Sequence, residues 1–164
     1  MIQKIIRFII IILPMLTLAI GMDCAVEDEN TVCLGFGEVN SASGEITINY
    51  SSQSPIWGFQ FHITEISIIS ASSDIGDIIF NPSTGEILGF SFSQPLDPGE
   101  NLELIKIYYS SQENITTCVD INPESDYPIV IGGENGFNFD IAFEENCLEL
   151  CFGDLEMDIC GVCG

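Results

Sequence analysis

A single tryptophan and a single histidine stand five residues apart in this chain, in the segment IWGFQFHI from Ile56 to Ile63. Histidine is the usual general base and a common metal ligand, and an exposed tryptophan can stack on a ligand ring. A catalytic triad or a histidine-based metal site needs further partners beside the imidazole. Because the chain has no second histidine and no cysteine stands out as a catalytic partner, we expect His62 to be an ordinary surface side chain.

The same segment has the alternation of a β-strand. Side chains of a strand point to opposite faces in turn, so residues five apart lie on different faces. Trp57 would therefore share a face with Phe59, Phe61 and Ile63. Large aromatic side chains on such a face are usually buried, which predicts a core position for Trp57. The alternative role for Trp57 is a ligand-binding platform for a glycan, which requires an exposed ring.

Acidic residues dominate the charge, with 25 Asp and Glu against three Lys and Arg. At this density many carboxylates pair by chance, so no pair is distinguished as the acid and nucleophile of a glycosidase. We therefore predict that the chain is not an enzyme. The negative charge also excludes nucleic acid as a partner, because such binding depends on Lys and Arg.

Calcium is the one ion that this composition favours, since its ligands are carboxylate and carbonyl oxygens. Asp154, Glu156 and Asp158 alternate near the end of the chain, and Asp74 and Asp77 flank a glycine. Neither segment has the spacing of an EF-hand loop. The first three residues remain candidate calcium ligands, the alternative is a solvated acidic surface, and no other cofactor is predicted.

Residues 1–21 have the pattern of a secretory signal peptide. Lys4 and Arg7 form a basic start, an apolar run extends from Phe8 to Ile20, and Ala19 and Gly21 have the spacing of a cleavage site. We expect this segment to be helical. The alternative, a retained membrane anchor, needs about 20 apolar residues, and this run is shorter. Contact with a membrane is therefore expected only through the export signal.

Seven cysteines follow the signal segment: Cys24, Cys33, Cys118, Cys147, Cys151, Cys160 and Cys163. In an exported chain they are expected to form disulfides. Cys24–Cys33 would tie down the N-terminal segment, and Cys151 with Cys160 or Cys163 would close the tail. A zinc site made by the last four thiolates is the alternative, which the oxidising medium disfavours. The odd count and the abrupt end at CGVCG indicate that the natural chain continues.

The segments between the cysteines read as short strands separated by turns rich in Gly, Pro, Asn and Ser. Alternation predicts that each of three groups shares one strand face: Ile46, Ile48 and Tyr50; Leu88, Phe90 and Phe92; and Phe137, Phe139, Ile141 and Phe143, which are expected to point inward. Residues 102–109 are apolar on both faces, as in a strand covered on both sides. The long stretch 65–81 is read as a strand, a loop and a short strand. These runs predict an all-β protein with an antiparallel β-sandwich.

Three motifs, in this order, carry a resemblance to a known family. They are GFQF at Gly58 to Phe61, GFS at Gly89 to Ser91, and the turn Pro98-Gly99 before an apolar strand. From Cys33 to Leu150 the chain resembles the cohesin-like β-sandwich domains of secreted surface proteins, which are related in fold to carbohydrate-binding modules and jelly rolls. The end of the chain, DICGVCG, resembles the Cys-Gly-Val-Cys-Gly repeats that follow such domains.

The resemblance implies an organisation and a role. The expected organisation is a signal peptide at 1–21, a linker at 22–32, a cohesin-like domain at 33–150 and a truncated cysteine-rich tail at 151–164. In this family the sandwich binds a partner module through one sheet face, and the resemblance further implies a Cys118–Cys147 disulfide. Asn114 begins the motif NIT, a glycosylation site where the host glycosylates.

The sequence thus predicts a secreted or cell-surface binding or adhesion module whose partner is a protein module or a polysaccharide. One alternative is a carbohydrate-binding accessory module, which needs exposed coplanar aromatic rings. The other is a structural spacer, whose faces would carry no contiguous apolar patch.

Overall fold

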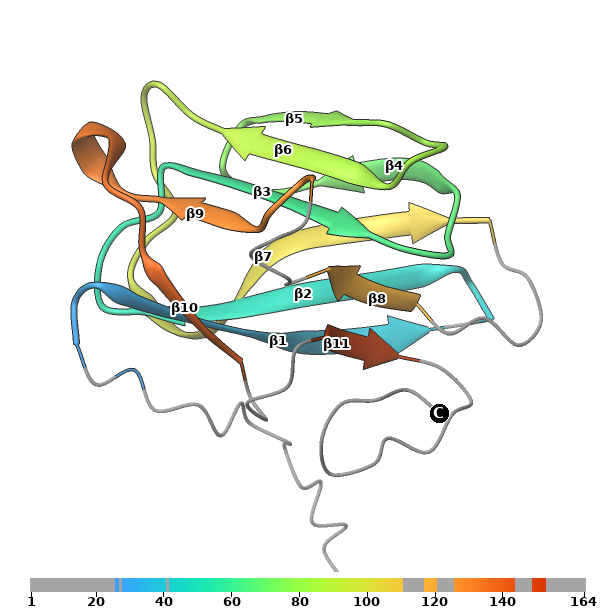
Figure 1. Cartoon of the computed structure of the whole chain (residues 1–164), viewed down its shortest axis with the longest axis horizontal. Coiled ribbons are helices and arrows are strands. Elements are labelled where there is room, and N and C mark those ends of the chain that lie inside the picture. Colours follow the sequence, from blue (N-terminus) through green and yellow to red (C-terminus); the bar gives the residue numbers. More distant parts are fainter. Residues whose placement is uncertain are drawn as a thin grey trace, which may run out of the picture.

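The computed structural model describes Val26 and residues 28–40, 42–110, 117–120, 126–143 and 149–152. The predicted signal helix at 1–21, part of the linker and most of the tail lie outside these residues. Within the described ranges the chain is built of strands arranged in two layers (Figure 1). No helix there is long and apolar enough to cross a membrane.

The strands follow one another along the chain with short connections. Their bounds are β1 Thr31–Asn40, β2 Glu45–Ser52, β3 Gly58–Ile63, β4 Ile68–Ser72, β5 Asp77–Phe80, β6 Glu86–Phe90, β7 Gly99–Tyr109, β8 Thr117–Asp120, β9 Val130–Gly132, β10 Asp140–Phe143 and β11 Glu149–Phe152, with a 3-10 turn η1 at Glu134–Gly136.

Two sheets pack face to face. One sheet has the strand order β10-β1-β2-β7-β4, and the other has the order β11-β8-β3-β6-β5, with β9 also paired to β3. All pairs are antiparallel except β1 with β10, which is parallel. The predicted antiparallel β-sandwich is therefore confirmed, with one parallel pair at an edge.

The core lies between the two sheets, and two predicted face patterns are found in it. Ile46, Ile48 and Tyr50 of β2 are buried, as alternation requires. Phe59 and Phe61 of β3 are buried as well, with ring centroids 5.8 Å apart. The stretch 65–81 forms β4, a loop and β5, as expected. Burial of these apolar side chains supplies the main stabilising free energy of the sandwich.

The prediction of a core position for Trp57 is wrong. Trp57 is half-buried and precedes β3, whereas Ile56 is fully buried. Ile56 forms an isolated bridge with Leu96, with backbone hydrogen bonds of 3.1 and 2.9 Å. Two residues then separate Ile56 from the next buried side chain, Phe59, so strict alternation begins only at Gly58. The alternation of β3 cannot be extended back to the indole.

β7 differs from the expectation of a strand covered on both faces. From Ile105 to Tyr109 its side chains alternate between buried and more accessible positions, and Tyr108 is exposed. The apolar appearance of the sequence arises partly from Leu104 and Ile105, two successive residues that are both buried. A register shift against β2 at this point makes the double burial possible.

The third group is inward only in part. Phe139 is buried, and Ile141 and Phe143 pack against the core. Phe137 is exposed, and its ring meets that of Phe139 edge-on at 5.3 Å. Because Phe137 follows the 3-10 turn η1 and precedes β10, it does not take part in the alternation of the strand.

Candidate binding surface

The outer face of the β3-containing sheet is defined by cross-strand register. Residues directly opposite one another in paired strands lie on the same face of a sheet. Phe59 and Ile87 are buried in the core, so their neighbours in β3 and β6 face outward. The central outward row across four strands is Ile79, Leu88, Gln60 and Val130. This row is apolar except for one amide.

A second outward row lies beside the first and contains Asp77, Phe90, Gly58 and Gly132. Because Gly58 and Gly132 have no side chains, the Phe90 ring has no outward neighbour on that side of the row. Phe92 lies just beyond the end of β6 and is 89% exposed. Its ring centroid is 5.3 Å from that of Phe90, with an angle of 68° between the rings. This edge-on pair enlarges the apolar surface but does not form a flat platform.

We call the outward side chains Gln60, Ile79, Leu88, Phe90, Phe92 and Val130 the β3–β6 face. The leucine and phenylalanines of β6 were predicted to share a strand face, and Leu88 and Phe90 do; the structure shows that this face points to solvent. The reason lies at Gly89, on the inward side of β6. A Cβ at Gly89 would lie 2.6 Å from Cε1 of Phe59, so the phenyl ring occupies the space that a side chain would need.

Polar groups border the β3–β6 face on one side. Glu86 and His62, which lie opposite one another, form the third outward row. The Nε2 atom of His62 donates a 2.5 Å hydrogen bond to the carbonyl oxygen of Thr84, which holds the ring toward the β5–β6 turn. An open depression of about 560 Å³ lies beside it, lined by residues 62–67 and 82–84. His62 is thus a half-buried side chain at the rim of the apolar surface.

Gln60 is held in place by a contact outside its own strand. Its Nε2 atom donates a 3.2 Å hydrogen bond to the carbonyl oxygen of Pro128, which precedes β9. The amide therefore has an internal partner and lies in the middle of the apolar row. Such a group can orient a partner by hydrogen bonding while the surrounding side chains supply contact area.

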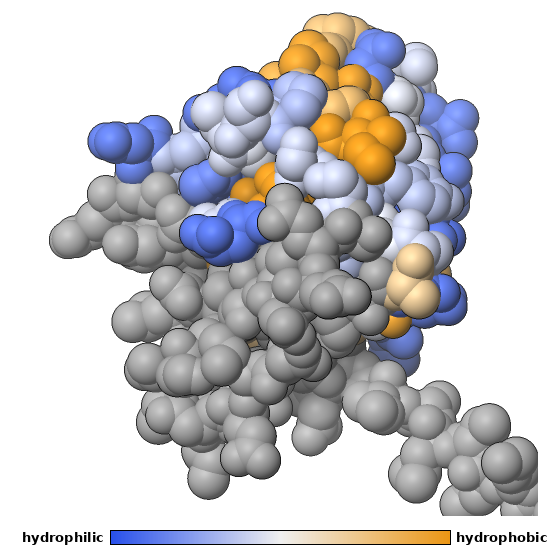
Figure 2. All heavy atoms as spheres, turned by 90° about the vertical axis from the view of Figure 1, so that its right-hand side faces the viewer, coloured by the Kyte–Doolittle hydropathy of each residue, from blue (hydrophilic) through white to orange (hydrophobic). Residues whose placement is uncertain are grey.

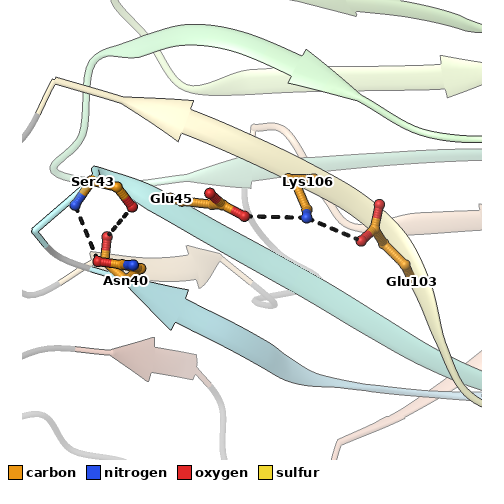
Figure 3. A network of polar contacts seen from close by, with 5 residues as sticks. All are labelled: Asn40, Ser43, Glu45, Glu103 and Lys106. Carbon is orange, nitrogen blue, oxygen red and sulfur yellow. Dashed lines mark hydrogen bonds and ion pairs between the residues drawn. The ribbon is translucent and has the colours of Figure 1, made fainter.

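The outer face of the other sheet has a different character. Lys106 of β7 lies 3.1 Å from a carboxylate oxygen of Glu45 and 3.8 Å from one of Glu103 (Figure 3). The hydrogen bond to Glu45, together with the charges of both carboxylates, raises the pKa of Lys106 above its ordinary value. Asn49 and Asn101 are joined by a 2.8 Å amide hydrogen bond on the same sheet. Polar groups on this face mostly satisfy one another.

Hydrophobic side chains also gather at the side where the two sheets end in β4 and β5. Figure 2 shows them near the top of the molecule, where β5 lies in Figure 1. Ile79 of β5 is 58% exposed and Ile69 of β4 is 65% exposed. The register of β4 against β7 shifts between Ile68 and Ser70, which places Ile69 at an irregularity of the edge strand. The apolar surface of the β3–β6 face thus extends to this edge.

Only some of the predicted site residues fall in the described part of the chain. Asn114, the calcium candidates Asp154, Glu156 and Asp158, and Cys24, Cys147, Cys160 and Cys163 all lie outside it. Cys33 is fully buried in β1 and is disulfide-bonded. Cys118 and Cys151 are placed on β8 and β11. The pairings Cys24–Cys33, Cys118–Cys147 and Cys151 with Cys160 or Cys163 stay predictions, as do the zinc and calcium hypotheses.

Among the residues that the structure describes, no three His, Cys, Asp or Glu side chains come together as a metal-binding group. Asp74 and Asp77, the second acidic pair of the sequence, are both exposed.

The chain was compared with known proteins. No family model matches it, and no curated protein matches it. Solved structures do match: a cohesin domain in the complex of CaDoc0917 with CaCohA2 has a TM-score of 0.50 and 14% identity, over 74% of this chain and 98% of the other. The type I cohesin of the Coh-OlpA–Doc918 complex from Clostridium thermocellum has a TM-score of 0.47 and 10% identity, over 76% and 99%.

A third solved structure, a type II cohesin–X-dockerin complex from Acetivibrio cellulolyticus, has a TM-score of 0.43 and 9% identity, over 69% of this chain and 93% of the other. At these identities the likeness concerns the fold. The chain has a cohesin-like β-sandwich fold, as the motifs of its sequence led us to expect.

Proposed function

We propose that this chain is an extracellular, non-catalytic binding module that docks a partner protein on the β3–β6 face. The observation that carries the proposal is the contrast between the two outer sheet faces. One presents Ile79, Leu88 and Phe90 in adjacent rows, next to the exposed Phe92. The other presents mostly polar groups that bond to one another, with Tyr108 37% exposed beside them. Exposed contiguous apolar surface on a soluble domain usually marks an interaction site.

The kind of partner follows from the composition of this surface. Protein interfaces combine an apolar, aromatic centre with a polar rim, and the β3–β6 face has both. The rim carries Glu86 and Asp77, and the whole chain is strongly acidic, so the partner should present a neutral or basic apolar patch. The CaDoc0917–CaCohA2 complex, whose cohesin shares the fold, is an assembly of two protein modules and supports a protein partner.

Two other roles fit the surface less well. Stacking of a glycan needs exposed rings that lie nearly in one plane, whereas Phe90 and Phe92 meet at 68°. A structural spacer does not account for a phenylalanine that is 89% exposed beside an outward leucine. The proposal includes export, which the pattern of residues 1–21 favours. An exported module must meet its partner outside the cell.

The proposal is tested by calorimetric titration of the full chain with a panel of dockerin modules that includes those of the three matched complexes. Binding by at least one module is expected, with affinity reduced tenfold or more in Leu88→Ser and in Phe92→Ser, because apolar contacts at an interface centre carry much of the free energy of binding. The matched control is Tyr108→Ser, an exposed position on the other sheet. Equal affinity of all variants, or retention on cellulose with no dockerin bound, contradicts the proposal.

A further inference from the structure

β8 and β11 bring two cysteines to the same position of an antiparallel ladder. The register of the pair places Cys151 directly opposite Cys118. The flanking partners are Val119 with Leu150 and Thr117 with Phe152, so the two cysteines lie within the ladder and not at its end. The residues are 33 positions apart in the sequence and meet only because the two strands pair.

This placement meets the distance requirement for a disulfide. Directly opposite residues of antiparallel strands have Cα atoms about 4.5 to 5.5 Å apart. Disulfide-bonded cysteines have Cα atoms about 4.4 to 6.8 Å apart. Residues opposite one another also lie on the same face of a sheet. Cys147, the partner implied by the family resemblance, precedes the first residue of β11, so the register gives the position opposite Cys118 to Cys151.

We propose that Cys118 and Cys151 form a cross-strand disulfide that joins β8 to β11. The two thiols lose two protons and two electrons as the S–S bond forms. A disulfide-bearing oxidant, such as glutathione disulfide, accepts them as its own S–S bond breaks to give two thiols. The export that the sequence predicts would place this exchange in a compartment where disulfides persist.

The proposed bond lies between the last two strands at one end of the sheet. Val119 is buried and lies opposite Ile63 of β3, and Cys118 is its neighbour in β8. The bond would therefore join β11 to the strand that pairs with β3. β11 is a four-residue strand at the end of this sheet. The disulfide fixes the border of the sheet covalently.

Peptide mapping of the exported full chain tests the pairing directly. Free thiols are blocked with N-ethylmaleimide, and the unreduced protein is cleaved after glutamate. The digest separates the five cysteines that follow Cys33 into peptides 114–124 with Cys118, 146–149 with Cys147, 150–156 with Cys151, and 157–164 with Cys160 and Cys163. The expected result is a linked pair 114–124 and 150–156 that disappears on reduction. A link from 114–124 to any other peptide, or a maleimide adduct on Cys118, overturns the proposal.

Single variants provide a second reading. In Cys118→Ser the thiol of Cys151 should become reactive to maleimide, and in Cys151→Ser that of Cys118 should. The matched control is Cys147→Ser, which should leave the linked pair of peptides in place. Loss of that pair in Cys147→Ser would show that Cys118 depends on Cys147 and would overturn the assignment. The map of the unmodified protein remains decisive even where a variant folds poorly.

Discussion

The hydroxyl group of Tyr50 donates a 2.7 Å hydrogen bond to the carbonyl oxygen of Asp97, so a side chain of β2 is tied to the turn that precedes β7. The Tyr50 side chain is buried between the sheets. Burial, followed by the negative charges of Asp97 and Asp74, raises the pKa of Tyr50 to about 12. The protonated phenol therefore belongs to the folded state, and its ionisation must oppose folding.

A pH dependence of stability follows from this shift. Because the pKa of Tyr50 is higher in the folded state than its ordinary value near 10, the stabilisation is fully present below pH 10. It is lost progressively as the pH rises from about 10 to about 12. Urea unfolding at a series of pH values should show this decline, and Tyr50→Phe should show a smaller one. Tyr50→Phe should also lose about 1 kcal/mol at neutral pH with the hydrogen bond.

The matched control for this titration is Tyr108→Phe, since Tyr108 is exposed on β7. Tyr109 and Tyr127 also have raised pKa values through burial, so the difference between Tyr50→Phe and the unmodified protein is the informative quantity. An unchanged alkaline decline in Tyr50→Phe would show that the buried phenol is not its source.

The contact between Gly89 and Phe59 yields a prediction about packing. In Gly89→Ala the new methyl group must displace the Phe59 ring from the core, because Cε1 and Cε2 both lie within 2.7 Å of the added Cβ. Overpacking of this kind costs about 1 to 3 kcal/mol, to be measured by chemical unfolding. Gly132→Ala is the control, since its nearest neighbour, the carbonyl oxygen of Gly58, is 3.6 Å away. Equal stability of the two variants would refute this account of why β6 turns Leu88 outward.

Much of the fold was predictable because alternation is a local property. In β2 and β3 each inward apolar residue is followed by a more polar outward one, so the period of two gives both the strand and its buried face. β6 shows where this fails. Ile87 and Gly89 form one face of β6, and Leu88 and Phe90 form the other. Hydrophobicity alone would predict that Leu88 and Phe90 are the buried pair, whereas Ile87 and Gly89 face the core. Only the tertiary partner, the Phe59 ring over Gly89, decides it.

The candidate site was missed for the same reason. Apart from the amide of Gln60, the β3–β6 face has no catalytic or metal-binding side chain. A search for such side chains therefore selects Trp57, His62 and the cysteines and does not predict this face. The glycine between two large apolar residues of β6 was the available signal. The parallel pairing of β1 with β10 was likewise not readable, because it joins segments more than 100 residues apart.

Substitutions of an exposed and of a buried phenylalanine should differ in their effect on the free energy of unfolding. Phe92→Ser should change the free energy of unfolding by less than about 0.5 kcal/mol, because an 89% exposed ring loses little packing. Phe59→Ala should cost about 3 to 5 kcal/mol, because a buried ring leaves a cavity. Chemical unfolding of both variants measures the difference. A large loss for Phe92→Ser would mean that its ring supports the fold, and its exposure could no longer be attributed to binding.

Cys33 offers a last test, on the other sheet. It is fully buried in β1 and disulfide-bonded, opposite Ser51 of β2 and Ala142 of β10. Loss of a native disulfide from a small domain costs about 2 to 5 kcal/mol, so Cys33→Ala should clearly lower the urea concentration at the midpoint of unfolding. The control is the unmodified protein in reducing agent, which should lose at least as much stability. If Cys33→Ala were as stable as the oxidised protein, the bond would contribute nothing to the fold, and the buried sulfur would act only as an apolar side chain of β1.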